Sequence, residues 1–343
     1  MTWILDQRRG DVPGQTVLFR VAAGPRIGFG HALRAGRLAR VLGEDARISL
    51  RGSPGVARTL SRCGFRLSQG SARSTLARHR PALLVLDDPS ATACDPWLGA
   101  ARELGVPVAS LHDAGLAHVA SDLRIDAGLV GWRGRRLAGV CLEGPRFAVL
   151  DPRLADLRTR RRSAAGRVLI GLGGGQHALR GLAIASAVKR LAPDVHVQIA
   201  PGFAGGRTTA APRDVEIVDP SAFLEALASA TVAVVNGGVT LYEACAIGTP
   251  VVALPMVAGQ AVTVTSFCTA GVLPVDPVLL DPAGPWPARQ ARVVERVRRL
   301  LLSREARARQ SRSGRALIDG QGARRVASAL RILMRAAPSA KAA

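Results

Sequence analysis

The chain of 343 residues has a single tyrosine, and aromatic residues make up only 3% of it. So few rings leave few platforms on which the bases of single-stranded nucleic acid can stack. No apolar run approaches the roughly 18 to 20 residues that a membrane-spanning helix needs. The first residues also lack the basic and apolar segments of a secretory signal. These absences predict a cytoplasmic protein rather than an integral membrane or secreted one.

Cysteine is scarce and irregularly spaced: the five residues are Cys63, Cys94, Cys141, Cys245 and Cys268. Their number is odd, and no two form the Cys-x-x-Cys pair that is typical of zinc ligands. We therefore expect small buried thiols rather than a disulfide framework or a metal centre.

Lysine is nearly absent, because 45 of the 47 basic residues are arginine. The formal net charge is +22, and residues 285–343 alone hold 15 basic and 3 acidic residues. Solvated faces of the last helices explain such a run most simply. The alternative is a weak peripheral contact of this basic C-terminal region with an anionic membrane. We expect no specific nucleic-acid partner.

Apolar residues are plentiful, and their order along the chain is regular. Hydrophobic residues make up 48% of the chain, which excludes wholesale disorder. Strands are predicted at Thr16–Ala22, Arg47–Leu50, Ala82–Leu86, Val106–Leu111, Arg167–Leu172, Val195–Ala200, Thr231–Val235 and Pro250–Leu254. Helices are predicted at His31–Leu42, Pro96–Leu104, His177–Leu191, Val239–Ile247, Ala288–Ser303 and Gly322–Met334. This alternation is typical of βαβ units, so we expect an α/β fold with mostly parallel sheets.

A charged stretch divides the pattern into two halves. Residues 151–166 contain seven Arg or Asp residues and no strand pattern. Each half opens with a strand, a glycine-rich turn and a helix. We therefore expect two Rossmann-like domains, residues 1–155 and 156–335, followed by a flexible tail, residues 336–343.

The glycine-rich turn of the first half is the sequence IGFGH, which ends at His31. Gly28 and Gly30 let the backbone turn sharply beside a ligand. His31 follows a strand at its carboxyl end, where open α/β sheets bind ligands. We expect the helix dipole to lower the pKa of His31, which leaves a neutral imidazole as a general base. A histidine that only caps the helix is the alternative.

Two further glycine turns lie in the second half. Gly173 and Gly174 follow a strand without the Lys-Ser/Thr of a P-loop, so they predict either a phosphate or sugar lining or a plain turn. Gly237 and Gly238 open a helix with Thr240 in its first turn, which predicts a diphosphate cradle.

Two polar residues accompany this cradle. Glu243 lies one turn into the helix and would accept hydrogen bonds from ribose hydroxyls. Gln260 begins the next helix and would reach the same pocket.

The block from Asn236 to Gln260 resembles the nucleotide-sugar site of glycosyltransferases of the B type. The order of motifs over residues 16–333 is more similar to the UDP-sugar hydrolase family of pseudaminic-acid biosynthesis, which cleaves UDP-2,4-diacetamido-2,4,6-trideoxy-β-L-altropyranose. That family has an Ile-Gly-x-Gly-His turn and an arginine three residues after the histidine, which is Arg34 here. The segment Leu142–Leu150 and the closing pattern Asp319–Val326 are also similar.

The resemblance implies two domains whose parallel sheets face each other across a cleft, with the nucleotide on the second domain. It implies hydrolysis of a UDP-sugar without a metal or cofactor: His31 activates water, which attacks the anomeric carbon with inversion. The helix that follows Gly237 and Gly238 would stabilise the departing diphosphate. Asp87 ends a strand and would assist His31, although a turn or helix-cap role for Asp87 and Asp88 is the alternative.

Two polar groups that the family carries near the sugar are replaced. Pro89 and Ser90 stand near the position of a usual tyrosine, and Gly259 stands in place of a usual asparagine. Two other functions therefore stay open. One is an inverting glycosyltransferase in which His31 deprotonates an acceptor hydroxyl, and the other is a non-catalytic protein that binds a nucleotide sugar.

Overall fold

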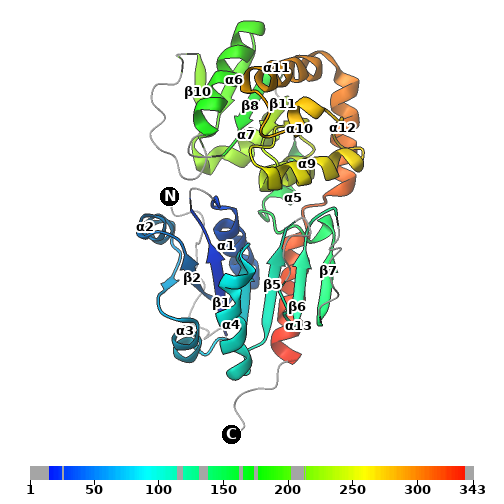
Figure 1. Cartoon of the computed structure of the whole chain (residues 1–343). Helices are drawn as coiled ribbons and strands as arrows, with labels where there is room; N and C mark the ends of the chain where they lie inside the picture. The colour runs from blue at the N-terminus through cyan, green and yellow to red at the C-terminus, as the bar shows by residue number, and fades with distance from the viewer. Residues whose placement is uncertain are drawn as a thin grey trace. The chain divides into compact units, whose positions relative to one another are not determined.

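The computed structural model describes residues 15–24, 27–113, 119–130, 138–161, 165–173, 177–201, 212 and 214–336. The chain divides into two compact units, one of residues 1–152 with 321–343 and one of residues 153–320 (Figure 1). Each unit is a parallel β-sheet with helices packed on it. Within the described ranges, no helix is long and apolar enough to cross a membrane.

The first unit contains a seven-stranded sheet in the order β3-β2-β1-β4-β5-β6-β7, and all neighbouring strands are parallel. Its strands are β1 (Thr16–Ala22), β2 (Asp45–Arg51), β3 (Leu67–Ser68), β4 (Leu83–Asp87), β5 (Val108–His112), β6 (Leu123–Asp126) and β7 (Val140–Glu143). Its helices are α1 (Gly30–Leu42), α2 (Pro54–Arg62), α3 (Ala72–His79), α4 (Ala91–Glu103) and α13 (Gly322–Ala336), with a short 3-10 helix at Pro145–Phe147. Every residue of β4 and β5 is buried, as expected for central strands covered on both faces.

The second unit contains a five-stranded parallel sheet in the order β10-β9-β8-β11-β12. Its strands are β8 (Arg167–Gly171), β9 (His196–Ile199), β10 (Val215–Ile217), β11 (Val232–Val235) and β12 (Val251–Ala253). Its helices are α5 (Leu154–Arg160), α6 (His177–Leu191), α7 (Phe223–Ser229), α8 (Val239–Ile247), α9 (Ala258–Thr269), α10 (Pro277–Leu280), α11 (Trp286–Leu302) and α12 (Arg304–Leu317), with a short 3-10 helix at Pro220–Ala222. Its core joins the valines and isoleucines of β8, β9 and β11 to α6 and α11.

Each sheet has one place where its strand order reverses. In the first unit β1 lies beside β4, and in the second unit β8 lies beside β11. The segments that leave neighbouring strands at such a point diverge, which opens a crevice at the carboxyl ends of the strands. The turns that contain Gly28, Gly173 and Gly237 follow three of these four strands, β1, β8 and β11.

The division of the chain differs from the one expected from the sequence. The chain leaves the first unit after Pro152 and returns to it at Gln321, so that α13 packs on α1 rather than within the second unit. Two buried residues of α13, Val326 and Leu330, explain this return because they need an apolar partner surface. Ala336 ends α13, and the rest of the expected tail, residues 337–343, lies outside the described residues.

Helices α3, α5 and α10 were not expected, and two further helices also differ from expectation. The helix expected to begin at Pro96 begins at Ala91, because Ser90 accepts a hydrogen bond from the Ala93 backbone N–H and so caps an earlier turn. Pro96 therefore lies inside α4. Helix α12 was not expected, and Ser303 starts it by accepting a hydrogen bond from the Ala306 N–H.

The return of α13 to the first unit leads to a stability test. Leu330→Ala removes a side chain with 0% exposure and should lower the free energy of unfolding by about 2–5 kcal/mol. Ile332→Ala on the same helix is the matched control, because Ile332 is 67% exposed and should change it by less than about 0.5 kcal/mol. Urea unfolding followed by circular dichroism measures both. Equal effects of the two substitutions would contradict the packing of α13.

Candidate functional site

The turn between β1 and α1 is built on backbone pairing. Gly24 and Gly28 exchange N–H···O=C hydrogen bonds of 3.0 and 2.6 Å. Gly28 has φ +85°, a left-handed conformation that favours glycine. Gly30 then opens α1, so the chain reverses tightly and delivers His31 to the carboxyl end of the sheet.

His31 points back to the end of β4. Its Nδ1 lies 2.8 Å from Oδ1 of Asp87, a residue 56 positions away in the sequence. Asp87 is fully buried, and the His31 side chain is 17% exposed. Nη2 of Arg34, which can only donate, lies 3.2 Å from the same Nδ1, farther than the carboxylate oxygen at 2.8 Å. Because an ionised carboxylate only accepts hydrogen bonds, we assign the Nδ1 proton to the shorter contact with Asp87, and Nε2 is then the lone-pair nitrogen of the neutral ring. The N-cap residue of α1 is Phe29, and Nδ1 of His31 contacts Asp87 rather than the helix backbone.

Arg34 lies one turn further along α1 and contacts the same carboxylate. Its Nε donates to Oδ2 of Asp87 at 2.8 Å, and its Nη2 donates to Oδ1 at 2.5 Å. Its Nη1 donates to Asp113 at 2.5 Å, just after β5. The residue is only 7% exposed. The sequence predicts Arg34 as a substrate-binding residue. In the structure its guanidinium is instead hydrogen-bonded to the carboxylates of Asp87 and Asp113.

The charges of this cluster act on one another. Burial raises the pKa of Asp87, but Arg34 and His31 outweigh burial and hold that pKa well below its usual range. Burial lowers the pKa of His31, but the Asp87 carboxylate outweighs burial and raises it above its ordinary value. The expectation of a pKa lowered by the helix dipole is therefore wrong, because the nearby carboxylate dominates over the partial charge of a helix end.

Asp88, the neighbour of Asp87, has the turn role that the sequence left open. Its carboxylate accepts hydrogen bonds from Nε of Arg51 at 2.7 Å and from the Ser90 N–H at 3.0 Å. Asp88 thereby joins the end of β2 to the start of α4, whereas Asp87 belongs to the His31 cluster.

In the second unit, Asn236 holds two of the predicted turns together. Its Nδ2 donates to the Leu172 carbonyl at 3.0 Å, and its Oδ1 accepts from the Gly238 N–H at 3.0 Å. Gly173 follows with φ +91°, and a Cβ there would lie 3.3 Å from Nδ2 of Asn236. No pattern in the sequence predicts this bridging role of Asn236. Gly174, predicted with Gly173, lies outside the described residues.

Gly237 allows a close approach between two helices. A Cβ at Gly237 would lie 2.5 Å from the Gln260 carbonyl oxygen and 2.9 Å from the Gln260 Cβ, so only glycine fits. Gly238 is the residue before α8, and no side chain caps that helix end. The first amides of α8 therefore resemble an anion site, with the partly exposed Thr240 in the first turn.

The two polar residues predicted beside this turn have different positions. Gln260 comes from α9, and its Oε1 accepts from the Met256 N–H at 2.8 Å. Its Nε2 lies 4.0 Å from the place that a Gly238 Cβ would occupy, so α9 brings an amide donor to the cradle. Glu243 is only 2% exposed, and α8 holds its side chain in the interior.

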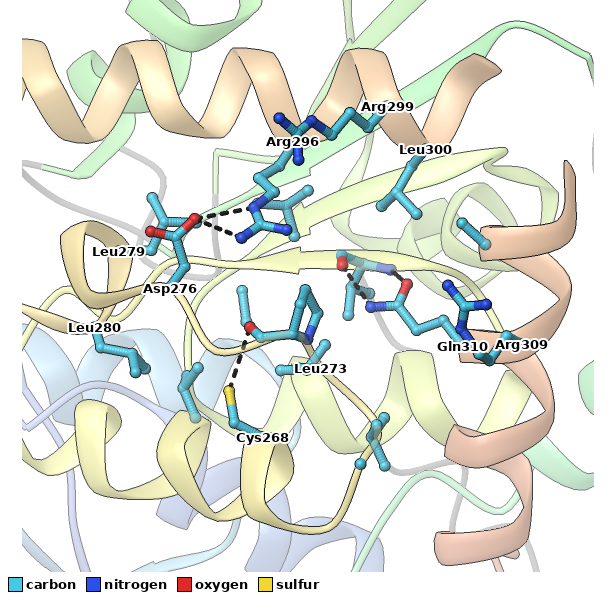
Figure 2. Close-up of a pocket in the computed structure, with 18 residues that line it drawn as sticks. Cys268, Leu273, Asp276, Leu279, Leu280, Arg296, Arg299, Leu300, Arg309 and Gln310 are labelled. Carbon is cyan, nitrogen blue, oxygen red and sulfur yellow. Dashed lines mark hydrogen bonds and ion pairs between the residues drawn. The ribbon is translucent and has the colours of Figure 1, made fainter. Parts of the chain in front are cut away.

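A cavity of about 380 Å³ lies elsewhere in the second unit, beyond the edge strand β12 (Figure 2). Its walls are mainly apolar, and Gln310 closes the strand edge by pairing with the Val251 N–H at 2.8 Å and the Val251 carbonyl at 2.9 Å. Asp276 on its wall binds Arg296. None of the predicted site residues lines this cavity. In the part of the chain that the structure describes, no three His, Cys, Asp or Glu side chains gather as a metal site requires.

Comparison with known proteins shows the fold. No family model and no curated sequence matches the chain. MurG of Acinetobacter baumannii superposes with a TM-score of 0.61 at 15% identity, over 92% of this chain and 99% of that one. The calicheamicin glycosyltransferase CalG4 gives 0.61 at 18% identity, over 95% and 100% of the two chains. UDP-GlcNAc 2-epimerase from Neisseria meningitidis gives 0.56 at 11% identity, over 92% and 100%. The chain therefore has the two-domain α/β fold of glycosyltransferases of the B type.

The raised pKa of His31 predicts how its contribution to stability depends on pH. A raised folded-state pKa adds stability that is present below the unfolded-state pKa and is lost as pH rises through the folded-state pKa. His31→Gln should therefore lower the free energy of unfolding more at about pH 5.5 than at about pH 8.5. Urea unfolding at the two pH values measures the difference.

His79 provides a control of opposite sign. Burial and the nearby Arg47 and Arg78 lower its pKa. His79→Gln should therefore lower the free energy of unfolding more at about pH 8.5 than at about pH 5.5. The same sign for both substitutions would contradict the electrostatic assignment of His31.

Proposed function

We propose that the protein catalyses inverting displacement at the anomeric carbon of a UDP-sugar, with His31 as general base. One observation carries this proposal: Nδ1 of His31 is bound at 2.8 Å by the buried Asp87 carboxylate, at the carboxyl ends of β1 and β4. This contact would favour the tautomer that leaves Nε2 as proton acceptor, and it would stabilise the imidazolium that forms.

The second unit would bind the nucleotide. The amides at the start of α8 and the Thr240 hydroxyl suit a diphosphate, and the Gln260 amide adds a donor from α9. Hydrogen-bond donors in this position stabilise negative charge as UDP departs. Gly28, Gly30 and Gly173 would keep the backbone close to the substrate. Glu243, predicted to contact the ribose, would do so only if its side chain, 2% exposed, turned outward from α8.

Water is the nucleophile that we favour, which makes the protein a UDP-sugar hydrolase of the pseudaminic-acid type. The order of the IGFGH turn, Arg34, the Gly237–Gly238 turn and Gln260 along the chain supports this choice. His31 takes one proton from water through Nε2 as oxygen bonds to the anomeric carbon and the bond to the diphosphate breaks. Attack from the face opposite UDP inverts the anomeric configuration.

An inverting glycosyltransferase is the second candidate, since the same base would deprotonate a hydroxyl of an acceptor. The similar structures favour it, because CalG4 is named as a glycosyltransferase. Pro89, Ser90 and Gly259 favour a third candidate, a paralogue that binds a nucleotide sugar without reaction. The ordered pair of His31 and Asp87 argues against it, because binding alone needs no aligned base.

The decisive experiment is proton NMR of the protein with UDP-2,4-diacetamido-2,4,6-trideoxy-β-L-altropyranose, without added metal. We expect release of UDP and of the free sugar with inverted configuration. His31→Ala should slow the release about 10²- to 10⁴-fold, as removal of a general base does. If UDP binds and nothing is released, the hydrolase proposal fails for this substrate. Turnover only after addition of an acceptor would instead identify a transferase.

The cradle has its own test with a matched pair of glycine substitutions. Gly237→Ala places a Cβ 2.5 Å from the Gln260 carbonyl oxygen, so α8 and α9 must move apart. We expect UDP affinity to fall roughly tenfold or more, as when one hydrogen bond to a charged group is lost. Gly259→Ala is the control, because no atom lies within 4 Å of its Cβ. Isothermal titration with UDP compares them, and equal affinities would contradict the cradle.

A further inference from the structure

Asp113 is the outermost member of the His31 cluster. It follows β5, and its side chain is 52% exposed. Both of its oxygens contact Arg34: Oδ1 accepts from Nη1 at 2.5 Å and Oδ2 accepts from Nη2 at 3.2 Å. One guanidinium therefore joins the ends of two neighbouring strands through Asp87 and Asp113.

The charges of the cluster show why a second carboxylate matters. Without Asp113, the positive charge of Arg34 would balance the negative charge of Asp87. A proton on His31 would then add an uncompensated positive charge at a largely buried site. With Asp113 ionised, the two carboxylates exceed the single guanidinium by one negative charge. Uptake of one proton by His31 then makes the cluster neutral, which favours the imidazolium.

Arg34 also has a geometric reason to need Asp113. A guanidinium has donors on two sides, and Asp87 occupies only one of them. Asp113 holds the other side, so that Arg34 stays directed between β4 and β5 and Asp87 stays aligned with His31. Among the described residues, the charged groups that act on His31 are Asp87 from β4, Arg34 from α1 and Asp113 after β5.

We propose that Asp113 is a positioning residue that acts through Arg34, so that the cluster becomes electrically neutral when His31 accepts the proton of the nucleophile. This role deepens the proposed function and rests on it, because a general base at His31 is what Asp113 would serve. Asp113 itself touches neither His31 nor Asp87 in any hydrogen bond found in the described residues.

The test is a titration of His31 that needs no substrate. The protein has six histidines, and the His31 signal in NMR of histidine labelled at Cε1 is the one lost in His31→Gln. Asp113→Asn keeps an oxygen for Arg34 but removes the charge, so the titration midpoint of His31 should move to lower pH. Asp113→Glu should restore most of the shift, because it returns the charge.

Asp45→Asn is the matched control. Asp45 also binds two arginines, Arg47 and Arg66, but it lies at the amino end of β2, away from His31. We expect no change of the His31 midpoint in this variant. A midpoint in Asp113→Asn that is unchanged, or that moves to higher pH, overturns the proposal.

The activity profile separates this proposal from the proposed function. The pH profile of kcat/KM is measured on any UDP-sugar that the wild type turns over. Asp113→Asn should shift the acidic limb of this profile to lower pH. It should also lower the alkaline plateau roughly threefold to tenfold, because a weaker base transfers protons less effectively. A merely structural role would lower the plateau without moving the limb, which would overturn the proposal. If no UDP-sugar is turned over but the NMR midpoint shifts, the charge coupling holds and the proposed function fails.

Discussion

The fully buried carboxylate of Asp87 imposes the main electrostatic constraint on the first unit. A carboxylate without exposure is costly unless positive charges and hydrogen-bond donors surround it. Arg34 and His31 provide them, and both come from the first turns of α1. The turn from Gly24 to Gly28 must therefore deliver α1 to the end of β4 in one orientation. The same contacts that stabilise the Asp87 carboxylate orient the His31 ring with Nδ1 toward Asp87, which is the orientation that the proposed base requires.

The α/β class was predictable because its signal is local. Alternating strand and helix patterns determine parallel sheets, and most predicted elements agree with the structure within a few residues. The errors have two causes, a local cap that the sequence analysis overlooked and a long-range partner. Ser90 rather than Pro96 starts α4 because the cap supplies a hydrogen bond that proline cannot. Helix α13 belongs to the first unit rather than the second because its apolar face packs on α1, which lies about 290 residues earlier in the chain.

The candidate site was predictable residue by residue but not as a network. Glycines in turns and a histidine after a strand are visible in the sequence, since each reflects a local backbone need. The contact between His31 and Asp87 depends on β4 lying beside β1, and the role of Asn236 depends on β11 lying beside β8. Asp113 has no sequence signal at all, because an acid after a strand is common in turns. Strand order, which is a property of the whole sheet, assembles these groups.

The choice between water and an acceptor would not depend on the proposed base. If His31 is that base, its Nε2 would accept a proton from any hydroxyl that reaches it, so the cluster of Asp87, Arg34 and Asp113 would serve hydrolysis and transfer equally. Selectivity must therefore come from groups that hold the sugar and the nucleophile. The resemblance to the UDP-sugar hydrolase family implies that Pro89 and Gly259 stand near two such positions, and neither offers a polar side chain. Under the proposed function, this arrangement would keep the base of the family and change the contacts to the sugar.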